Sequence, residues 1–324
     1  MINANYSYIA LGKQADASTI ASSFTNFVKF ESESLKKSIE KIEDNVKTGQ
    51  RFTDKIYSGT QKNEGSISSI TPDLANLGVF LNLAGFQDSA ALKDGSTGVY
   101  IHTMTLTEDD ADLDYYTIQK YNGLQLENFI GSLGSKFELS CSVNELLKLS
   151  VDIKALTHSK STDVTVDKQA PSYQTTYVPF TFVHGILKIE STEVEISKFS
   201  IVYENALGEN YKLGQATPKS LNTDKSKIDI SLETLLDSAS DTLQNYFYAN
   251  TEKSIELYFQ TTEEIETGHK GVFKLMIPRA IIDDWSGNIG TESKINVSIA
   301  LKALANYSGE TITGIIENLQ SAVY

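Results

Sequence analysis

The sequence has few of the residues from which active sites and metal centres are built. Its single cysteine, Cys141, excludes an intrachain disulfide and a zinc site made of several cysteines. Its four histidines lie more than four residues from one another, so none forms a closely spaced metal-binding pair; they are His102, His158, His184 and His269. The sequence therefore predicts no metal site and no cofactor.

Long apolar runs and positive charge are scarce as well. No run of eighteen or more apolar residues occurs, and residues 1–5 lack the basic and apolar regions of a signal peptide. We therefore expect a protein made in the cytoplasm, with no secretion signal and no membrane anchor. The 28 basic and 42 acidic residues leave a net charge of −14, which disfavours tight binding to phosphate backbones.

Familiar catalytic motifs are absent from the sequence: there is no G-x-S-x-G, no glycine-rich phosphate loop and no H-E-x-x-H. The acidic run at 108–114 fails as an EF-hand loop, since Tyr115 stands where glycine is needed and Tyr121 where glutamate is needed. We interpret the run as a solvated acidic turn and leave cation binding there open. The adjacent carboxylates Asp283 and Asp284 would point to opposite faces of a strand and could not flank one bond. We predict no catalytic residue and no enzyme activity.

The residues that are plentiful are typical of β-structure. The chain contains 16 tyrosines and 14 phenylalanines but only five prolines. Apolar and polar residues alternate, as on a half-buried strand, at 137–143, 147–153, 199–203, 255–259 and 295–301. Cys141 falls in the first of these stretches, so we expect its thiol to be buried and unreactive.

Residues 21–157 and residues 180–305 share a weak sequence similarity. Asp44-Asn45 returns as Glu204-Asn205, and Ile-Thr-Pro-Asp at 70–73 returns as Ile-Ser-Leu-Glu at 230–233, both at an offset of 160. Ile-Lys-Ala-Leu at 153–156 returns as Leu-Lys-Ala-Leu at 301–304, at an offset of 148. The common order of these matches predicts two tandem β-units.

Leucine-spaced segments follow both junctions and predict one helix in each unit, at 72–86 and at 232–247. Segment 35–46 fits a helix or a strand, and we interpret it as a strand because its repeat partner alternates. The polar segment 54–66 is expected to be a loop or hairpin tip.

These elements predict a mainly β fold, with two tandem β-units and one helix in each unit. The first unit, with an N-terminal arm, is placed at 1–157. A linker follows at 158–178, where Ser, Thr, Asp and Lys predominate. The second unit, with a C-terminal tail, is placed at 179–324.

Four stretches carry a family resemblance. They are FVKFESESLKKSIEKIEDNVKTGQR at 27–51, NEGSI at 63–67 leading through Thr-Pro to Leu-Ala-Gly at 83–85, the segment 114–155, and KLMIPRAIIDD at 274–284. In pattern and order they resemble the major tail tube protein of long-tailed, siphovirus-type bacteriophages. The resemblance implies a structural virion protein of the phage tail whose rings stack into the tube through which DNA is ejected into the host.

The resemblance also implies how the chain assembles. In that family each unit folds as a small β-sandwich or half-barrel with one flanking helix, and neighbouring units join their sheets into a β-barrel, typically with six units to a ring. Two fused units therefore imply homotrimeric pseudo-hexameric rings, with homohexamers as the alternative. The implied partners are the tail terminator, tape measure and distal tail proteins. We expect segment 54–66 and the N-terminal or linker arms to bridge successive rings.

The excess of acidic residues fits a channel that lets DNA pass without holding it. Glu43, Asp44 and Glu204 are our candidates for its wall. Two other hypotheses stay open at this point: a two-domain β-sandwich adhesin or receptor-binding virion protein, and a β-rich polysaccharide lyase or hydrolase.

Overall fold

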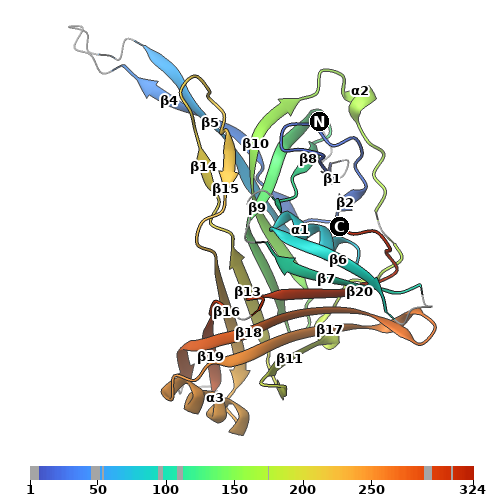
Figure 1. Ribbon diagram of the computed structural model, residues 1–324, viewed down its shortest axis with the longest axis vertical. Helices are drawn as coiled ribbons and strands as arrows, with labels where there is room; N and C mark the ends of the chain where they lie inside the picture. The colour runs from blue at the N-terminus through green and yellow to red at the C-terminus, as the bar shows by residue number, and fades with distance from the viewer. Residues whose placement is uncertain are drawn as a thin grey trace.

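The computed structural model describes residues 7–44, 52, 55–93, 98–107, 112–173, 175–287, 294–307 and 309–324. The chain is mainly β-structure, as predicted, and its paired strands are antiparallel (Figure 1). No helix of the described part is long and apolar enough to cross a membrane.

One sheet of eight strands runs through both halves of the chain. Its two end strands are β4 and β18, and β3 (Ser32–Glu33) continues the edge of β4. In spatial order the strands are β4 (Lys36–Glu43), β5 (Ile56–Ile70), β10 (Lys148–Lys160), β9 (Leu126–Ser142), β13 (Lys198–Glu204), β16 (Lys227–Leu235), β19 (Asn296–Ala303) and β18 (His269–Gly287).

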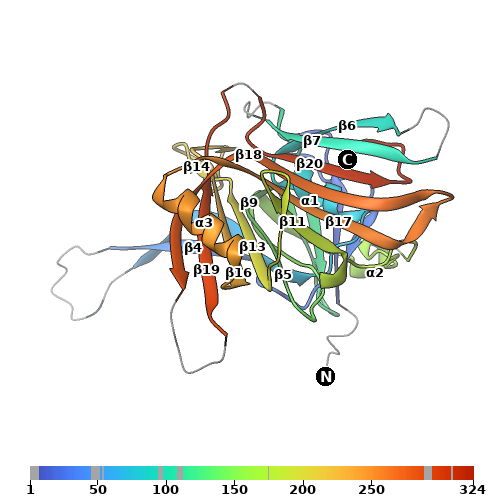
Figure 2. The same ribbon diagram turned by 90° about the horizontal axis from the view of Figure 1, so that it is seen from below.

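Two of these strands, β9 and β18, are long enough to belong to a second set of strands as well. The first part of β9 pairs with β8 (Tyr116–Tyr121), which continues to β1 (Tyr8–Lys13) and β2 (Asn26–Val28). The first part of β18 lies between two groups (Figure 2). These are β17 (Lys253–Glu266), β11 (Gly185–Ile189) and β12 (Thr192–Val194) on one side, and β20 (Thr313–Asn318), β7 (Tyr100–Leu106) and β6 (Phe86–Leu92) on the other.

The two halves of the chain pair their strands in the same order. In the first half the order is β2, β1, β8, β9, β10, β5, β4, and in the second it is β12, β11, β17, β18, β19, β16, β13. The hairpin β6–β7 is an addition of the first half, and β20 is an addition of the second.

The pairing register of the hairpin β9–β10 is repeated in the hairpin β18–β19 at an offset of 148 residues, which is one of the offsets found in the sequence. Phe137 pairs with Val151, and Trp285 pairs with Ile299, an offset of 285 − 137 = 148. Both hairpins also carry a one-residue bulge, at Ser135 in β9 and at Asp283 in β18, again 148 apart. A shared bulge is strong support for common ancestry, because bulges are retained features of a strand pair.

The helix of the first half is confirmed but is shorter than predicted. It is α1, Asn76–Leu83, and all its residues are buried. The predicted cap, Thr71, is not the residue that closes its first turn; the carboxylate of Asp73 accepts hydrogen bonds from the backbone N–H of Ala75 and Asn76, both at 2.9 Å. The chain leaves the helix through Gly85, whose φ of +98° favours glycine.

The predicted start of the second helix is wrong. Residues 232–235 belong to β16, where Ile228, Ile230 and Leu232 are buried on one face and β13 and β19 pair with the two edges. Helix α3 is Ser238–Tyr248, and Asp237 caps it by accepting a hydrogen bond from the N–H of Ser240. The counterpart of Asp73 is therefore Asp237 and not Glu233. Strand pairing on both edges outweighed the helical leucine spacing.

Segment 54–66 is also corrected, because residues 56–66 belong to the strand β5 and not to a loop. Its outer residues pair with β4 at 56–64 and its inner residues pair with β10 at 63–70, so neighbouring strands bond the backbone along the whole segment. Gly65 is required there: a Cβ at this position would lie 2.6 Å from the backbone of Leu35. Segment 35–46 is confirmed as a strand over Lys36–Glu43, and residues 45 and 46 lie outside the described part.

The segment expected to be a linker is partly structured. Its first three residues complete β10, and Val164–Asp167 form the short helix α2, capped by Asp163. Val164 and Tyr173 pack against a small cluster that contains Tyr8 and Phe27. Residues 1–6 lie outside the described part; β1, which follows them, is a buried strand and not part of an arm.

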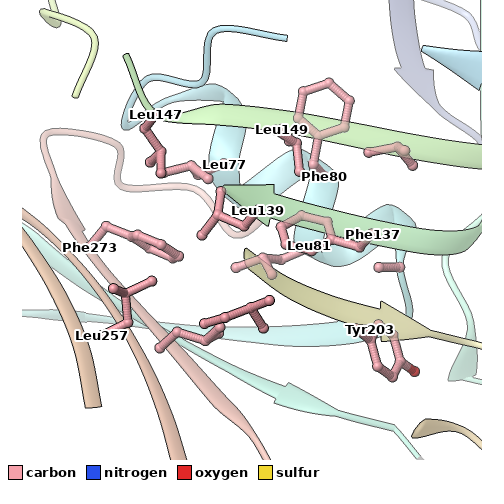
Figure 3. Close-up of a cluster of buried hydrophobic side chains, with 14 of the residues drawn as sticks. Leu77, Phe80, Leu81, Phe137, Leu139, Leu147, Leu149, Tyr203, Leu257 and Phe273 are labelled. Atoms are coloured by element: carbon pink, nitrogen blue, oxygen red, sulfur yellow. The ribbon is translucent and has the colours of Figure 1, made fainter. Parts of the chain in front are cut away.

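One large apolar cluster joins the two halves (Figure 3). Leu77 and Phe80 of α1 meet Phe137 and Leu139 of β9, and Leu257 and Phe273 of the second half belong to the same cluster. The C-terminal residue strengthens this connection, since the buried ring of Tyr324 lies against Gly78 and its hydroxyl donates to the carbonyl of Leu74 at 3.0 Å.

Candidate assembly surfaces

The described residues hold no group of three or more His, Cys, Asp and Glu side chains that could bind a metal ion. His102 is fully buried and is held by Asp88 at 2.7 Å and by the carbonyl of Gln320 at 2.8 Å. Cys141 is buried in β9, as predicted, and burial raises the pKa of its thiol to about 11, which disfavours the reactive thiolate at neutral pH.

The acidic run at 108–114 falls largely outside the described residues. Of its members the structure describes Asp112, Leu113 and Asp114. The carboxylate of Asp114 forms an ion pair with Lys13 at 3.0 Å.

The eight-strand sheet has one apolar and one polar face. On β13, Phe199, Ile201 and Tyr203 are buried, whereas Lys198 and Glu204 face the other way. The pairing register continues this division from Lys36 on β4 to Asp284 on β18. The sheet therefore presents a broad face of polar side chains on the side opposite its buried apolar residues.

The polar face carries both signs of charge in close pairs. The ion pairs on it include Lys136–Glu138 at 3.4 Å, Lys198–Glu233 at 3.0 Å, Lys227–Glu204 at 3.1 Å and Lys302–Asp283 at 2.7 Å. Glu204 raises the pKa of Lys227, and Asp283 raises that of Lys302. Each of these four lysines is thus largely compensated by a neighbouring carboxylate, which weakens its attraction for an anion.

Asp152, also on this face, is a partly buried carboxylate outside these close ion pairs. Burial raises the pKa of its carboxyl, Lys136 opposes that rise, and Glu138 and Glu204 add to it. Its equivalent in the second half, 148 residues later, is Ala300.

Strands β9 and β13 form the seam where the two halves meet within the sheet. Cys141 pairs with Phe199, Leu139 with Ile201, and the register ends at Lys136 opposite Glu204. Since β9 belongs to the first half and β13 to the second, this seam is a contact between two duplicated units inside one chain.

Two hairpin arms project from the same side of the sheet (Figure 1). The first is β4–β5, and the second, between β13 and β16, contains β14 (Gly208–Asn210) and β15 (Ser220–Asn222). They touch where the N–H of Gln61 donates to the carbonyl of Ala216 at 2.8 Å and the hydroxyl of Tyr211 donates to the carbonyl of Gln61 at 3.1 Å.

The outer part of the first arm is unusually apolar for an exposed hairpin. Ile39, Ile42, Ile56 and Tyr57 are each between 39% and 59% exposed. Side chains of this kind gathered on a projecting hairpin mark a contact surface.

A family model for phage tail tube proteins matches residues 5–303 of the chain. The chain belongs to the phage tail tube protein family. The match spans both halves and the seam between them, so the whole eight-strand sheet lies within it. No curated protein matches the chain.

The three residues that we expected to line the tube have different surroundings in this tail tube protein. Glu204 lies on the polar face and is paired with Lys227. Glu43 and Asp44 lie at the outer end of β4, on the projecting arm and away from the seam. The sequence carried no signal for the seam itself, because β9 and β13 are 56 residues apart at their closest paired positions, 198 − 142.

Proposed function

We propose that this tail tube protein polymerises into stacked rings and forms the conduit for ejection of phage DNA into the host. The observation that carries the proposal is the eight-strand sheet, which is apolar on one face and polar on the other. Among the described residues, β4 and the Asp284–Gly287 part of β18 have no strand on their outer edges. A sheet of this kind closes its edges by joining other copies of itself.

Each ring contains three chains and therefore six units, placed at 1–157 and 179–324 with residues 158–178 between them. Three sheets of eight strands give 24 strands. At a spacing of about 4.8 Å and a tilt of about 40° they enclose a barrel about 48 Å across between backbones. Porins of 16–18 strands already leave an aqueous channel, so three chains suffice for a wide one.

The polar face of the sheet lines the channel, since the apolar face is occupied by α1 and the core. Four of its lysines, Lys136, Lys198, Lys227 and Lys302, are held by carboxylates 2.7–3.4 Å away, which limits their contact with DNA phosphates. Fewer phosphate contacts mean fewer released counterions and weaker retention of the duplex.

Successive rings contact each other through the arms. All arms of a ring project in one direction, and the exposed Ile39, Ile42, Ile56 and Tyr57 become buried in the next ring. Within the segment first expected to bridge rings, this role belongs to the outer end of the hairpin, because the rest of β5 lies inside the sheet.

In the virion the protein occupies the tail after synthesis in the host cytoplasm. Its partners there are other copies of itself and the tail terminator, tape measure and distal tail proteins, with DNA in transit. Its role is structural and involves no catalysis, cofactor or metal.

Negative-stain microscopy of the purified chain at high concentration tests the proposal. We expect rings or hollow tubes, and image averaging should show three chains to a ring. Six chains to a ring would reject the trimer but keep the tube. A compact oligomer without a channel would reject the tube and favour the adhesin hypothesis.

A further inference from the structure

Within the described residues of the second half of the chain, the strand edge that is equivalent to the β9 edge of the seam is unpaired. On β9 the seam covers residues 136–142, and the equivalent edge of β18, 148 residues later, begins at Asp284. Among the described residues, Asp284–Gly287 pair with β19 on one edge and with no strand on the other. At the equivalent edge β9 pairs with β13, whereas this part of β18 has no such partner strand within the part of the chain that the structure describes.

The strand that is equivalent to β13 also has an open edge. Gly65 pairs with Ile153 and Ile230 pairs with Leu301, so Gly65 and Ile230 are equivalent, with an offset of 230 − 65 = 165. Glu64 in turn pairs with Lys36, and Asp229 pairs with Val202, so Lys36 is equivalent to Val202, with an offset of 202 − 36 = 166.

Burial supports this equivalence. Leu35 and Ile201 come out as equivalent residues, and both are 1% exposed. In the described part of the chain, β3 and β4 pair with β5 and with no other strand. The open edge thus belongs to the strand formed by β3 and β4.

We propose, on the basis of the proposed function, that these two edges pair with each other between neighbouring chains of a ring. The register of this pairing follows from the seam, where Lys136 of β9 pairs with Glu204 of β13. Adding 148 to the β9 residue and subtracting 166 from the β13 residue places Asp284 of one chain opposite Ser38 of the next. The same transfer places Lys37 opposite Trp285, Lys36 opposite Ser286 and Leu35 opposite Gly287.

The side chains on the two edges are complementary. Lys36, Lys37 and Asp284 are exposed and form no ion pair within the described part of the chain. In the transferred register Lys36 and Asp284 lie diagonally on the polar face, where opposite charges attract. Lys37 lies opposite the indole of Trp285, a position that suits a cation–π contact.

The backbone of Leu35 is prepared for an incoming strand. Ser34 donates its N–H to the carbonyl of Ser66 on β5, so the groups of Leu35 point away from β5. In the isolated chain its N–H donates to the carboxylate of Glu33 at 2.9 Å, and its carbonyl accepts from the ammonium of Lys120 at 2.9 Å. Side chains therefore occupy the groups that a neighbouring strand would bond, which keeps the edge satisfied until assembly.

Disulfide trapping tests the pairing. The double variant Ser38→Cys/Asp284→Cys should form tubes that, after oxidation, run on non-reducing gels as covalent dimers and trimers and return to monomers on reduction. Directly opposed residues of antiparallel strands have the Cα separation that a disulfide needs. The matched control, Ser38→Cys/Ser298→Cys, moves one cysteine to β19 and should give no ladder. The native Cys141 is buried and does not interfere.

Charge exchange provides a second test that needs no new cysteine. Lys36→Glu and Asp284→Lys should each weaken association by roughly two- to fivefold at each contact, and the double exchange should restore it. Circular dichroism confirms that each variant is folded. Tubes without cross-linking and without charge rescue would overturn the edge pairing but keep the tube. A wild-type chain that forms no rings or tubes would instead overturn the proposed function.

Discussion

Strand β13 and the strand formed by β3 and β4 hold equivalent places in the two halves, yet β13 has partners on both edges and β3–β4 on one. The difference arises because the chain contains one of the two contacts between units and leaves the other to be made between chains. The filled position shows what an assembled edge looks like: apolar residues face the core and paired charges face the opposite side. The open position shows how a single chain protects such an edge with lysines and with side-chain hydrogen bonds.

Truncating the aromatic residue at the centre of each contact should give the largest effects. The kind of effect should differ between the contact within the chain and the contact between chains. Phe137→Ala removes a side chain that is 3% exposed and should cost about 3–5 kcal/mol of unfolding free energy. Its equivalent Trp285 is half-buried, so Trp285→Ala should cost about 1–3 kcal/mol but abolish rings. Chemical denaturation and electron microscopy measure the two effects. Equal losses of stability with intact rings for Trp285→Ala would contradict the comparison.

Exchanges at the equivalent positions Gly65 and Ile230 should differ in kind. Gly65→Ala forces a methyl group against the backbone of Leu35 and should cost about 1–3 kcal/mol by pushing β3–β4 away from β5. The control Ile230→Val only trims a buried side chain and should cost about 0.5–1.5 kcal/mol. Proteolysis of the first arm should increase for Gly65→Ala alone. An unchanged cleavage rate would show that the arm is held by other contacts.

The arms should affect stacking more than folding. Ile42→Ser combined with Tyr57→Ser changes two half-exposed side chains, so the stability should move by less than about 0.5 kcal/mol while tubes shorten to single rings. Leu213→Ser on the second arm is the matched control for the first, since Leu213 is fully exposed. Tube length in micrographs is the measurement. Full-length tubes from the double variant would remove the first arm from the ring-to-ring contact.

The smallest effect should come from replacing Asp152 with the residue found at the equivalent position in the second half. Burial raises the pKa of this carboxyl above its unfolded value, so its charged form costs stability at pH values above the folded pKa, and the cost disappears below the unfolded pKa. Asp152→Ala, the residue found at the equivalent position 300, should raise the melting temperature at pH 7 by less than about 2 °C. Melting curves at pH 7 and pH 3.5 should show the gain only at the higher pH.

Much of the architecture could be predicted from local patterns in the sequence. Alternation identified the strands at 137–143, 147–153, 199–203 and 255–259, because each has a face that must be buried. The offset of 148 in the repeat coincides with the register of two hairpins, down to their bulges. The buried Cys141 and the existence of one helix in each half followed from the same patterns.

The predictions that were wrong all depended on what a segment pairs with. Leu232 and Leu235 have helical spacing, but two neighbouring strands bond the backbone there and move the helix to Asp237 and beyond. Segment 56–66 is polar, yet β4 pairs with its outer part and β10 with its inner part, so it is a strand. The sequence offset of 160 placed the start of the second helix four residues too early, because short sequence matches do not show how long the preceding strand is.

The sequence by itself determined the class of structure, the duplication and the absence of familiar catalytic and metal-binding motifs, since alternation, repeats and composition are local properties of the chain. Only the tertiary structure decided where the two halves meet. The seam joins β9 to β13 across residues far apart in the chain, and no local pattern specifies which edge a strand will choose. That choice fixes which edges of the sheet remain open, because a strand edge can be bonded only once. In the described part of the chain it leaves unpaired the outer edge of β4 and that of Asp284–Gly287 in β18.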